Sequence, residues 1–135
     1  QLKKLDDFVI ARQQKANFYC QALANLPLIL PQQTTIHDQS AWHIFVAELQ
    51  AQDKVADRGQ TRKTVFEKLV EKGIGVNVHY IPIHLHPYYH QLGFKYGDLP
   101  CAERYYERAI TLPLYPSITQ QQQQMVVDAL TEILA

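Results

Sequence analysis

The chain is organised around residues 73–90, which read Gly73-Ile-Gly-Val-Asn-Val-His-Tyr-Ile-Pro-Ile-His-Leu-His-Pro-Tyr-Tyr-His90. Four of the six histidines lie here, together with three tyrosines and two prolines. Apolar Val76 and Val78 alternate with polar neighbours, which is the period of a half-buried strand. Pro82 and Pro87 each remove a backbone donor, so they end regular strand pairing. The stretch therefore predicts a strand that delivers histidine and tyrosine side chains into a functional loop.

Upstream of this stretch, the pattern predicts a long helix and a strand. Residues 2–24 contain no proline or glycine, and apolar side chains recur along one face at steps of three and four. That face consists of Leu2, Leu5, Val9, Ala16, Tyr19 and Leu23. Residues 28–38 read as a short apolar run and a polar turn. Residues 42–49 are aromatic and β-branched, as expected of a strand, with His43 as a core or edge histidine.

A second helix is expected directly before the key stretch, after a polar loop at residues 50–60. Thr61 is the expected N-cap, and Gly73 follows Lys72 in the usual helix C-terminal arrangement. The buried stripe is predicted to comprise Val65, Phe66, Leu69 and Val70. Strand, helix and strand then form a unit of the length expected for α/β packing.

Downstream, three short elements and a final helix are expected. Residues 88–93 predict a helical turn that ends at Gly93, and Pro100 opens a helix to about Ala109. Residues 110–112 predict a strand. Thr119 and Gln122 fit a capping box for the last helix, with glutamines 120–124 as its solvated first turns and Val126, Ala129, Leu130 and Ile133 as its apolar face. The predicted fold is α/β or α+β: a short sheet of three or four strands covered by helices in two layers.

Composition limits the classes of partner. Lys plus Arg and Asp plus Glu number 13 each, so the net charge is zero with neutral histidine, which argues against a basic nucleic-acid surface. No apolar run approaches the roughly 20 residues that span a bilayer. Cys20 and Cys101 lack metal-binding spacing and predict free thiols in a reducing, cytoplasmic compartment. The single methionine is Met125, and we expect the chain to be the C-terminal part of a longer protein.

The histidines allow three interpretations. A metal site could use His84 and His86, which point the same way on an extended segment, with His79 or His90 as a third ligand. However, no acidic residue or cysteine lies within the cluster to form a second shell. Histidine and tyrosine could instead recognise a phosphorylated or sugar ligand through hydrogen bonds. The third interpretation is aromatic filling of an interface, without any ligand.

Arg62 is a second candidate contact, at the start of the second helix. A positive side chain at the positive end of a helix is mildly unfavourable unless an anion lies nearby. A solvated or salt-bridged surface arginine is the commoner interpretation.

Several motifs in fixed order together resemble the DegT/DnrJ/StrS family of pyridoxal-phosphate-dependent sugar-nucleotide aminotransferases. They are Arg62 through Leu69, Gly73-Ile74, the run His79 to Tyr89, Pro100-Cys-Ala-Glu103, and Leu112-Pro-Leu-Tyr-Pro116 with Thr119. The resemblance covers nearly the whole chain, and the histidine run is its specific part. Within the family the chain is most similar to the pseudaminic-acid-pathway transaminases, which act on a UDP-linked 4-keto-6-deoxy-N-acetylhexosamine.

The resemblance implies the small C-terminal domain of an aspartate-aminotransferase-type (fold type I) enzyme. Residues 1–25 would link this domain, residues 26–135, to a missing large domain. Pyridoxal phosphate would carry an amino group from glutamate to the keto sugar, in a homodimer with shared active sites. By position, His79 and Tyr80 would lie near the sugar nucleotide, with His84 and His86 in the adjoining loop and Arg62 as a further substrate contact.

The same resemblance implies that the catalytic parts lie outside this chain. The Schiff-base lysine and the cofactor contacts of the family belong to the large domain, so no catalytic, cofactor-binding or metal residue is assigned here. This chain alone is expected neither to transaminate nor to bind the cofactor. The alternative is a non-catalytic binding or dimerisation module of the same fold.

Overall fold

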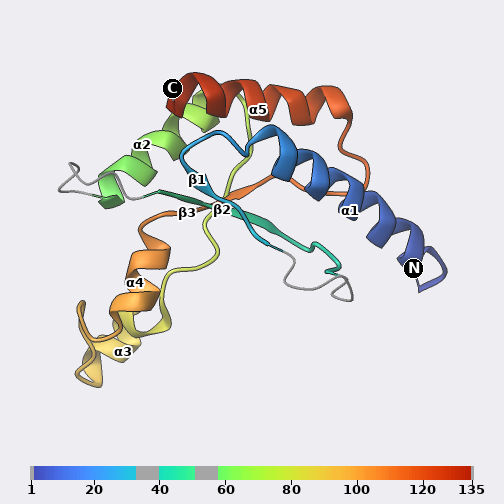
Figure 1. Ribbon diagram of the computed structural model, residues 1–135. Coiled ribbons are helices and arrows are strands. Elements are labelled where there is room, and N and C mark those ends of the chain that lie inside the picture. Colours follow the sequence, from blue (N-terminus) through green and yellow to red (C-terminus); the bar gives the residue numbers. More distant parts are fainter. Residues whose placement is uncertain (1, 33–39, 51–57, 135) are drawn as a thin grey trace.

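The computed structural model describes residues 2–32, 40–50 and 58–134, with residues 58–61 described by their backbone alone. A three-stranded antiparallel sheet has the order β1 (Leu28–Ile29), β2 (Phe45–Leu49) and β3 (Ala109–Leu112). Helices α1 (Leu5–Ala22) and α5 (Gln120–Leu134) lie side by side over one face of this sheet, and α2 (Arg58–Glu71) also packs against α5 (Figure 1). The predicted short sheet covered by helices is therefore confirmed.

The core lies between the sheet and these helices. Phe45, Ala47 and Leu49 alternate with half-buried residues along β2, so one face of the strand points inward. Tyr19 from α1 packs on Phe45 with ring centroids 5.2 Å apart. Each large apolar side chain removed from water here stabilises the fold by about 1.5–3 kcal/mol.

The first turns of the N-terminal helix are less buried than the periodicity predicts. A 3-10 turn at Leu2–Lys4 leads into α1, so a helical segment is confirmed. Ala16, Tyr19 and Leu23 are fully buried, but Leu2 is 84% and Leu5 49% exposed. The expected apolar face is wrong at that end because these turns extend past the sheet that covers the rest (Figure 1).

The strand predicted at residues 42–49 is shorter than expected. Trp42 has a positive φ of 46°, so the chain turns there and its ring stacks on Phe45, with centroids 5.8 Å apart. His43 is exposed and precedes the strand, which corrects its prediction as a core or edge histidine. The polar turn expected within residues 33–38 and most of the loop expected at residues 50–60 lie outside the described residues.

Helix α2 begins at Arg58, before the expected cap at Thr61, which is therefore inside the helix. Its C-terminus is as predicted: Gly73 has φ 75°, its amide bonds the carbonyl of Val70, and the amide of Ile74 bonds that of Leu69. These two bonds define a Schellman motif. The predicted buried stripe is wrong at Val70, which is 51% exposed.

The strand expected after Gly73 is reduced to one residue pair. The backbone N–H groups of Asn77 and Thr111 donate to each other's carbonyls over 3.1 and 2.8 Å. The next amide, of Val78, bonds the side-chain Oδ1 of Asn77 at 2.7 Å instead of a neighbouring strand. In an antiparallel pair the residue next to a hydrogen-bonded pair directs its amide away from the partner strand, so this bond is compatible with the bridge at Asn77. Beyond that bridge, no described residue of the segment pairs with β3, and the fourth strand does not form.

A small lobe of residues 79–106, here called the histidine lobe, projects on the other side of the sheet from α1 and α5 (Figure 1). It contains a 3-10 turn at Ile83–Leu85, α3 (Pro87–Gln91) and α4 (Pro100–Tyr106). The predicted helical turn before Gly93 is confirmed. The helix after Pro100 ends at Tyr106 rather than near Ala109, because Ala109 already belongs to β3.

The last helix begins as the capping box predicts. The amide of Thr119 donates to Gln122 Oε1 at 2.9 Å, and the amide of Gln122 donates to Thr119 Oγ1 at 3.2 Å. The glutamine run is not all solvated, however. Gln123 is 3% exposed and its Nε2 donates to the carbonyl of Lys15 at 3.1 Å, which ties α5 to α1.

Candidate functional site

His79 is held against the sheet by β3. Its Nδ1 lies 2.8 Å from Oγ1 of Thr111, whose side chain is 6% exposed. The backbone pairing of Asn77 with Thr111 holds the chain two residues before His79 and so fixes where the His79 backbone lies. Among the described residues none forms a hydrogen bond to His79 Nε2, so this nitrogen is available to a ligand.

Tyr80 lies beside His79, where the chain enters the histidine lobe. The two rings meet edge to face, with centroids 4.5 Å apart and an interplanar angle of 88°. Tyr80 is 73% exposed. A fixed imidazole beside a projecting phenol offers hydrogen-bonding groups and an aromatic surface, which suits a polar ligand such as a sugar.

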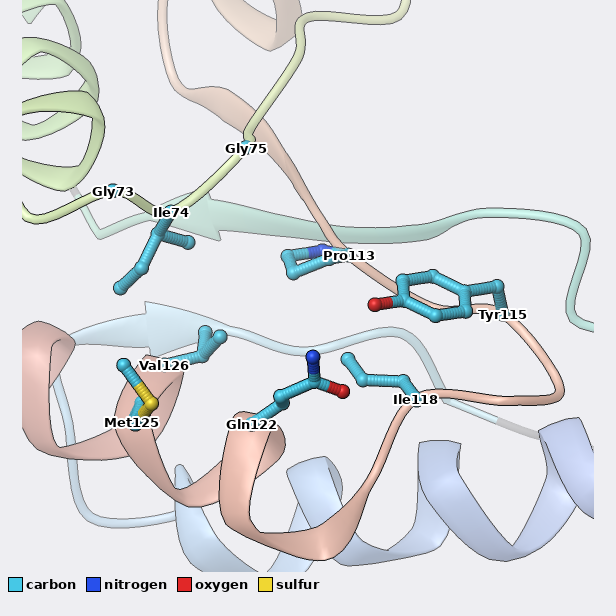
Figure 2. Close-up of a pocket in the computed structure, with 9 residues that line it drawn as sticks. All are labelled: Gly73, Ile74, Gly75, Pro113, Tyr115, Ile118, Gln122, Met125 and Val126. Carbon is cyan, nitrogen blue, oxygen red and sulfur yellow. The ribbon is translucent and has the colours of Figure 1, made fainter.

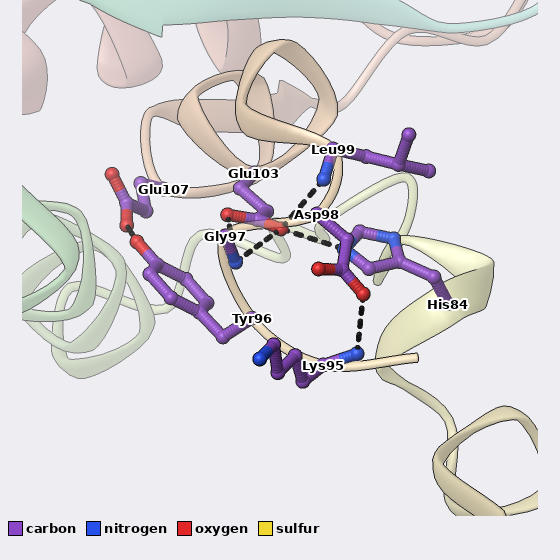
Figure 3. Close-up of polar contacts among 8 residues, drawn as sticks. All are labelled: His84, Lys95, Tyr96, Gly97, Asp98, Leu99, Glu103 and Glu107. Carbon is purple, nitrogen blue, oxygen red and sulfur yellow. Dashed lines mark hydrogen bonds and ion pairs between the residues drawn. The ribbon is translucent and has the colours of Figure 1, made fainter. Parts of the chain in front are cut away.

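His84 lies inside the histidine lobe instead of on its surface. Its Nε2 is 2.7 Å from Oε1 of Glu103, and the two residues are only 4% and 3% exposed (Figure 3). The Glu103 carboxylate also accepts the amide of Gly97 at 2.9 and 3.0 Å and that of Leu99 at 3.3 Å. One carboxylate thus joins the histidine loop to α4 and the turn before it.

The environment of Glu103 keeps it ionised. Burial by itself would raise the pKa of this carboxyl, but hydrogen bonds from His84, Gly97 and Leu99 outweigh it and lower the pKa below its ordinary value. Sequence reasoning missed this partner because Glu103 is 19 residues from His84. The only signal was the Pro100-Cys-Ala-Glu103 motif, which carries no information on contact.

The other histidines of the stretch do not gather around His84. His86 and His90 are exposed at α3. In the described part of the chain, no group of three or more histidine, cysteine, aspartate or glutamate side chains is placed to hold a metal ion. The arrangement therefore favours hydrogen bonding over metal coordination as the chemistry of this loop.

Arg62 contacts an aromatic ring on the histidine lobe. Its guanidinium carbon lies 4.8 Å above the centroid of Tyr106, and its buried Nε has no hydrogen-bond partner among the described residues. Arg62 also lines an open pocket of about 500 Å³ with Lys63, Phe66, Glu67 and Val78. Its position is the second turn of α2 rather than the first, so the predicted conflict with the helix dipole does not arise.

A second hollow lies on the opposite side of the fold from the histidine lobe. It has a volume of about 250 Å³ and is bordered by Gly73, Ile74 and Gly75, by Pro113 and Tyr115, and by α5 (Figure 2). Figure 2 shows Met125 and Gln122 of α5 facing Ile74 and Pro113 across it. Its described lining contains no charged side chain, so it does not suit a phosphorylated ligand.

The residues described here do not form a pyridoxal phosphate site. A lysine that forms a Schiff base is activated by desolvation or by a neighbouring cation. All described lysines are exposed or half-buried, and Lys63 and Lys72 pair with Glu67 and Glu132. None of the described helices is long and apolar enough to cross a membrane.

Solved structures share this backbone. DesV from S. venezuelae is 31% identical, with a TM-score of 0.82 over 97% of this chain and 33% of DesV. PseC from Helicobacter pylori, an aminotransferase involved in the biosynthesis of pseudoaminic acid, is 25% identical, with a TM-score of 0.84 over 99% of this chain and 34% of PseC. The fold is therefore that of a domain of the aminotransferase class.

Sequence comparison identifies the family. The model of the DegT/DnrJ/EryC1/StrS aminotransferase family matches residues 1–131, and the chain belongs to this family. The spore coat polysaccharide biosynthesis protein SpsC of Bacillus subtilis (strain 168) is 41% identical over 139 residues, which cover 99% of this chain and 34% of SpsC. The chain thus spans about a third of the length of the curated relatives it matches.

Proposed function

We propose that this chain is the small C-terminal domain of a pyridoxal-phosphate-dependent sugar-nucleotide aminotransferase. The observation that carries the proposal is family membership over residues 1–131. The whole enzyme would transfer an amino group from glutamate to a UDP-linked 4-keto-6-deoxy sugar in surface-glycan biosynthesis. The similarity to SpsC and to PseC supports a role in glycan biosynthesis, and the pseudaminic-acid precursor is the proposed substrate.

The cofactor and its lysine belong to the rest of the enzyme in this proposal, since the described lysines do not suit the role. When bound, pyridoxal phosphate supplies the electron sink for amino transfer. The present domain supplies contacts to the sugar nucleotide and covers the site. The enzyme would be a homodimer in the cytoplasm, a compartment consistent with the free thiols of Cys20 and Cys101.

The proposed substrate-binding residues differ in how directly they can act. His79 and Tyr80 offer a free ring nitrogen and an exposed phenol, so we assign them direct contact with the sugar nucleotide. His86 is exposed on the adjoining loop and is a further contact. We assign His84 an indirect role, in which it holds the loop in place, because it is buried and its Nε2 is already bonded to Glu103. Arg62 stays a proposed anion contact next to its stacking on Tyr106.

The alternative function is a binding or dimerisation module without catalysis. Large apolar side chains exposed on the histidine lobe favour a partner surface there. They include Tyr80, Ile83, Tyr88, Leu92 and Tyr96, each more than 60% exposed. A larger protein that never binds pyridoxal phosphate would support this alternative.

The deciding experiment uses the complete protein that contains this segment. Its visible absorption spectrum is recorded before and after addition of glutamate. We expect the band of bound pyridoxal phosphate and its loss as the amino group is transferred to the cofactor. Addition of candidate UDP-linked keto sugars should then restore the band, and the sugar that restores it fastest is the substrate. No cofactor band, even with added pyridoxal phosphate, would overturn the enzyme proposal.

A further inference from the structure

We propose that Thr111 is a positioning residue for His79: its hydroxyl fixes the imidazole so that Nε2 faces the sugar nucleotide. This inference rests on the proposed function. Thr111 Oγ1 and His79 Nδ1 are 2.8 Å apart, which is a strong hydrogen bond between groups 32 residues apart in the sequence. The hydroxyl acts through His79 and is not itself a substrate contact.

The position of Thr111 in the sheet makes its hydroxyl a fixed point. On one side Thr111 pairs with Val46 of β2, and on the other its backbone exchanges two hydrogen bonds with Asn77. Its β-branched side chain has few rotamers, so a fixed backbone also fixes Oγ1. The imidazole therefore docks on a residue of β3 that has backbone neighbours on both sides.

The buried position of Thr111 would be filled equally well by an apolar side chain, so packing does not explain its hydroxyl. All four residues of β3 are buried, and its other members are Ala109, Ile110 and Leu112. Burying a hydroxyl without a partner costs free energy, whereas valine has the same shape and suits a buried strand. The hydroxyl of Thr111 bonds His79, so orienting that ring is what threonine provides here and valine could not.

Fixing Nδ1 determines where the opposite nitrogen points. The hydroxyl can donate to or accept from Nδ1, so the bond fixes the orientation of the ring and the direction of Nε2 in either neutral tautomer. The Tyr80 ring also packs edge to face against the imidazole, with centroids 4.5 Å apart. The segment is held a second time by the bond from His84 to Glu103, so residues 79–84 are anchored at both ends.

The test uses the full-length protein and compares Thr111→Val with Thr111→Ser. Valine keeps the shape and removes the hydroxyl, while serine keeps it. The two half-reactions are measured separately by the cofactor band. We expect Thr111→Val to slow the half-reaction with the sugar nucleotide by about 10- to 100-fold, the scale of a misplaced group, and to leave that with glutamate unchanged. Thr111→Ser should recover most of the loss.

A matched control separates this effect from general destabilisation. Thr131 lies on α5, outside the histidine lobe, and its hydroxyl donates to the carbonyl of Val127 at 2.8 Å. Thr131→Val should therefore change neither half-reaction. In a double-mutant cycle, Thr111→Val should add little to His79→Gln, because both remove the same oriented nitrogen. Full additivity, or an unchanged sugar half-reaction in Thr111→Val, would overturn the inference.

A readout independent of activity separates failure of this inference from failure of the proposed function. The ring nitrogens of His79 are observed by ¹⁵N NMR in histidine-labelled protein and assigned with His79→Gln. Thr111→Val should shift the Nδ1 resonance of His79, because this nitrogen loses its hydrogen-bond partner. A wild-type protein without cofactor chemistry would refute the proposed function, while an unchanged His79 spectrum in Thr111→Val would refute the positioning role.

Discussion

Nε2 of His84 lies 2.7 Å from Oε1 of Glu103, and this bond closes the histidine lobe from within. The same carboxylate holds the amides of Gly97 and Leu99, so three segments depend on one side chain. Figure 3 shows these segments converging on Glu103, with Tyr96 bonded to Glu107 beside them. The described helices of the lobe are short, so the hydrogen bonds of the buried Glu103 carboxylate supply stability that a larger apolar core would otherwise provide.

Glu103→Gln should loosen the histidine lobe at neutral pH. The pKa of Glu103 is lowered, so its ionised form stabilises the fold above the ordinary glutamate pKa of 4.5, and this contribution is lost as the pH falls through the lowered value. Hydrogen exchange of residues 95–99 in the full-length protein should be faster in the variant at pH 7. In acid, the difference in stability from wild type should shrink.

The control for this prediction is Glu132→Gln. Glu132 pairs with Lys72 at 2.8 Å but is exposed, so its loss should leave exchange at residues 95–99 unchanged. Equal protection in wild type and Glu103→Gln at pH 7 would contradict the role assigned to the carboxylate.

Two local signals in the sequence predicted helix ends correctly, whereas the expected cap at Thr61 was wrong because α2 begins at Arg58. Gly73 ends α2 and Thr119 begins α5, because each signal acts through bonds to residues within a few positions. Signals that depend on distant residues were misread. The alternation around Val76 resembles a strand, yet only Asn77 pairs with β3. Gln123 looked solvated within its run, but its amide reaches the carbonyl of Lys15 on α1.

The candidate site could be predicted only in part for the same reason. The cluster of histidines and tyrosines predicted a region for ligand contacts, and that remains a prediction. It could not show that His79 docks on Thr111 or that Glu103 buries His84, since these partners are 32 and 19 residues away. Only the folded chain separates the accessible His79 from the buried His84.

Gly73→Ala should destabilise the fold through the backbone alone. Gly73 has φ 75°, and a Cβ there would meet nothing within 4 Å. The left-handed conformation costs a residue with a side chain about 1–2 kcal/mol, so the free energy of unfolding in urea should fall by that amount. Gly75 also has an open surrounding but no positive φ, so Gly75→Ala should be neutral or slightly stabilising. Equal effects at both positions would contradict this account.

Thr119→Ala should destabilise α5 by about 1 kcal/mol, the usual loss for an N-cap. The hydroxyl of Thr119 accepts the amide of Gln122 at 3.2 Å, and alanine leaves this donor without a side-chain partner. Gln121 is an exposed neighbour in the first turn, and Gln121→Ala should have little effect because alanine is a good helix former. Urea denaturation of both variants checks the difference, and a loss as large in Gln121→Ala would point away from capping.

Arg62→Met should destabilise the contact between α2 and the histidine lobe by about 1 kcal/mol, and Arg62→Lys by less, because an ammonium keeps part of the attraction to the ring. The guanidinium carbon lies over the Tyr106 ring at 4.8 Å from its centroid, and lysine keeps the charge but lacks the planar group. Lys63→Met is the matched control, because Lys63 is exposed and its 3.8 Å pair with Glu67 contributes little. Unfolding in urea checks these values. Under the proposed function, a KM of the full-length protein for the sugar nucleotide that rises in Arg62→Met and recovers in Arg62→Lys would show that the charge binds substrate. An unchanged KM in both variants would leave stacking as the role of Arg62.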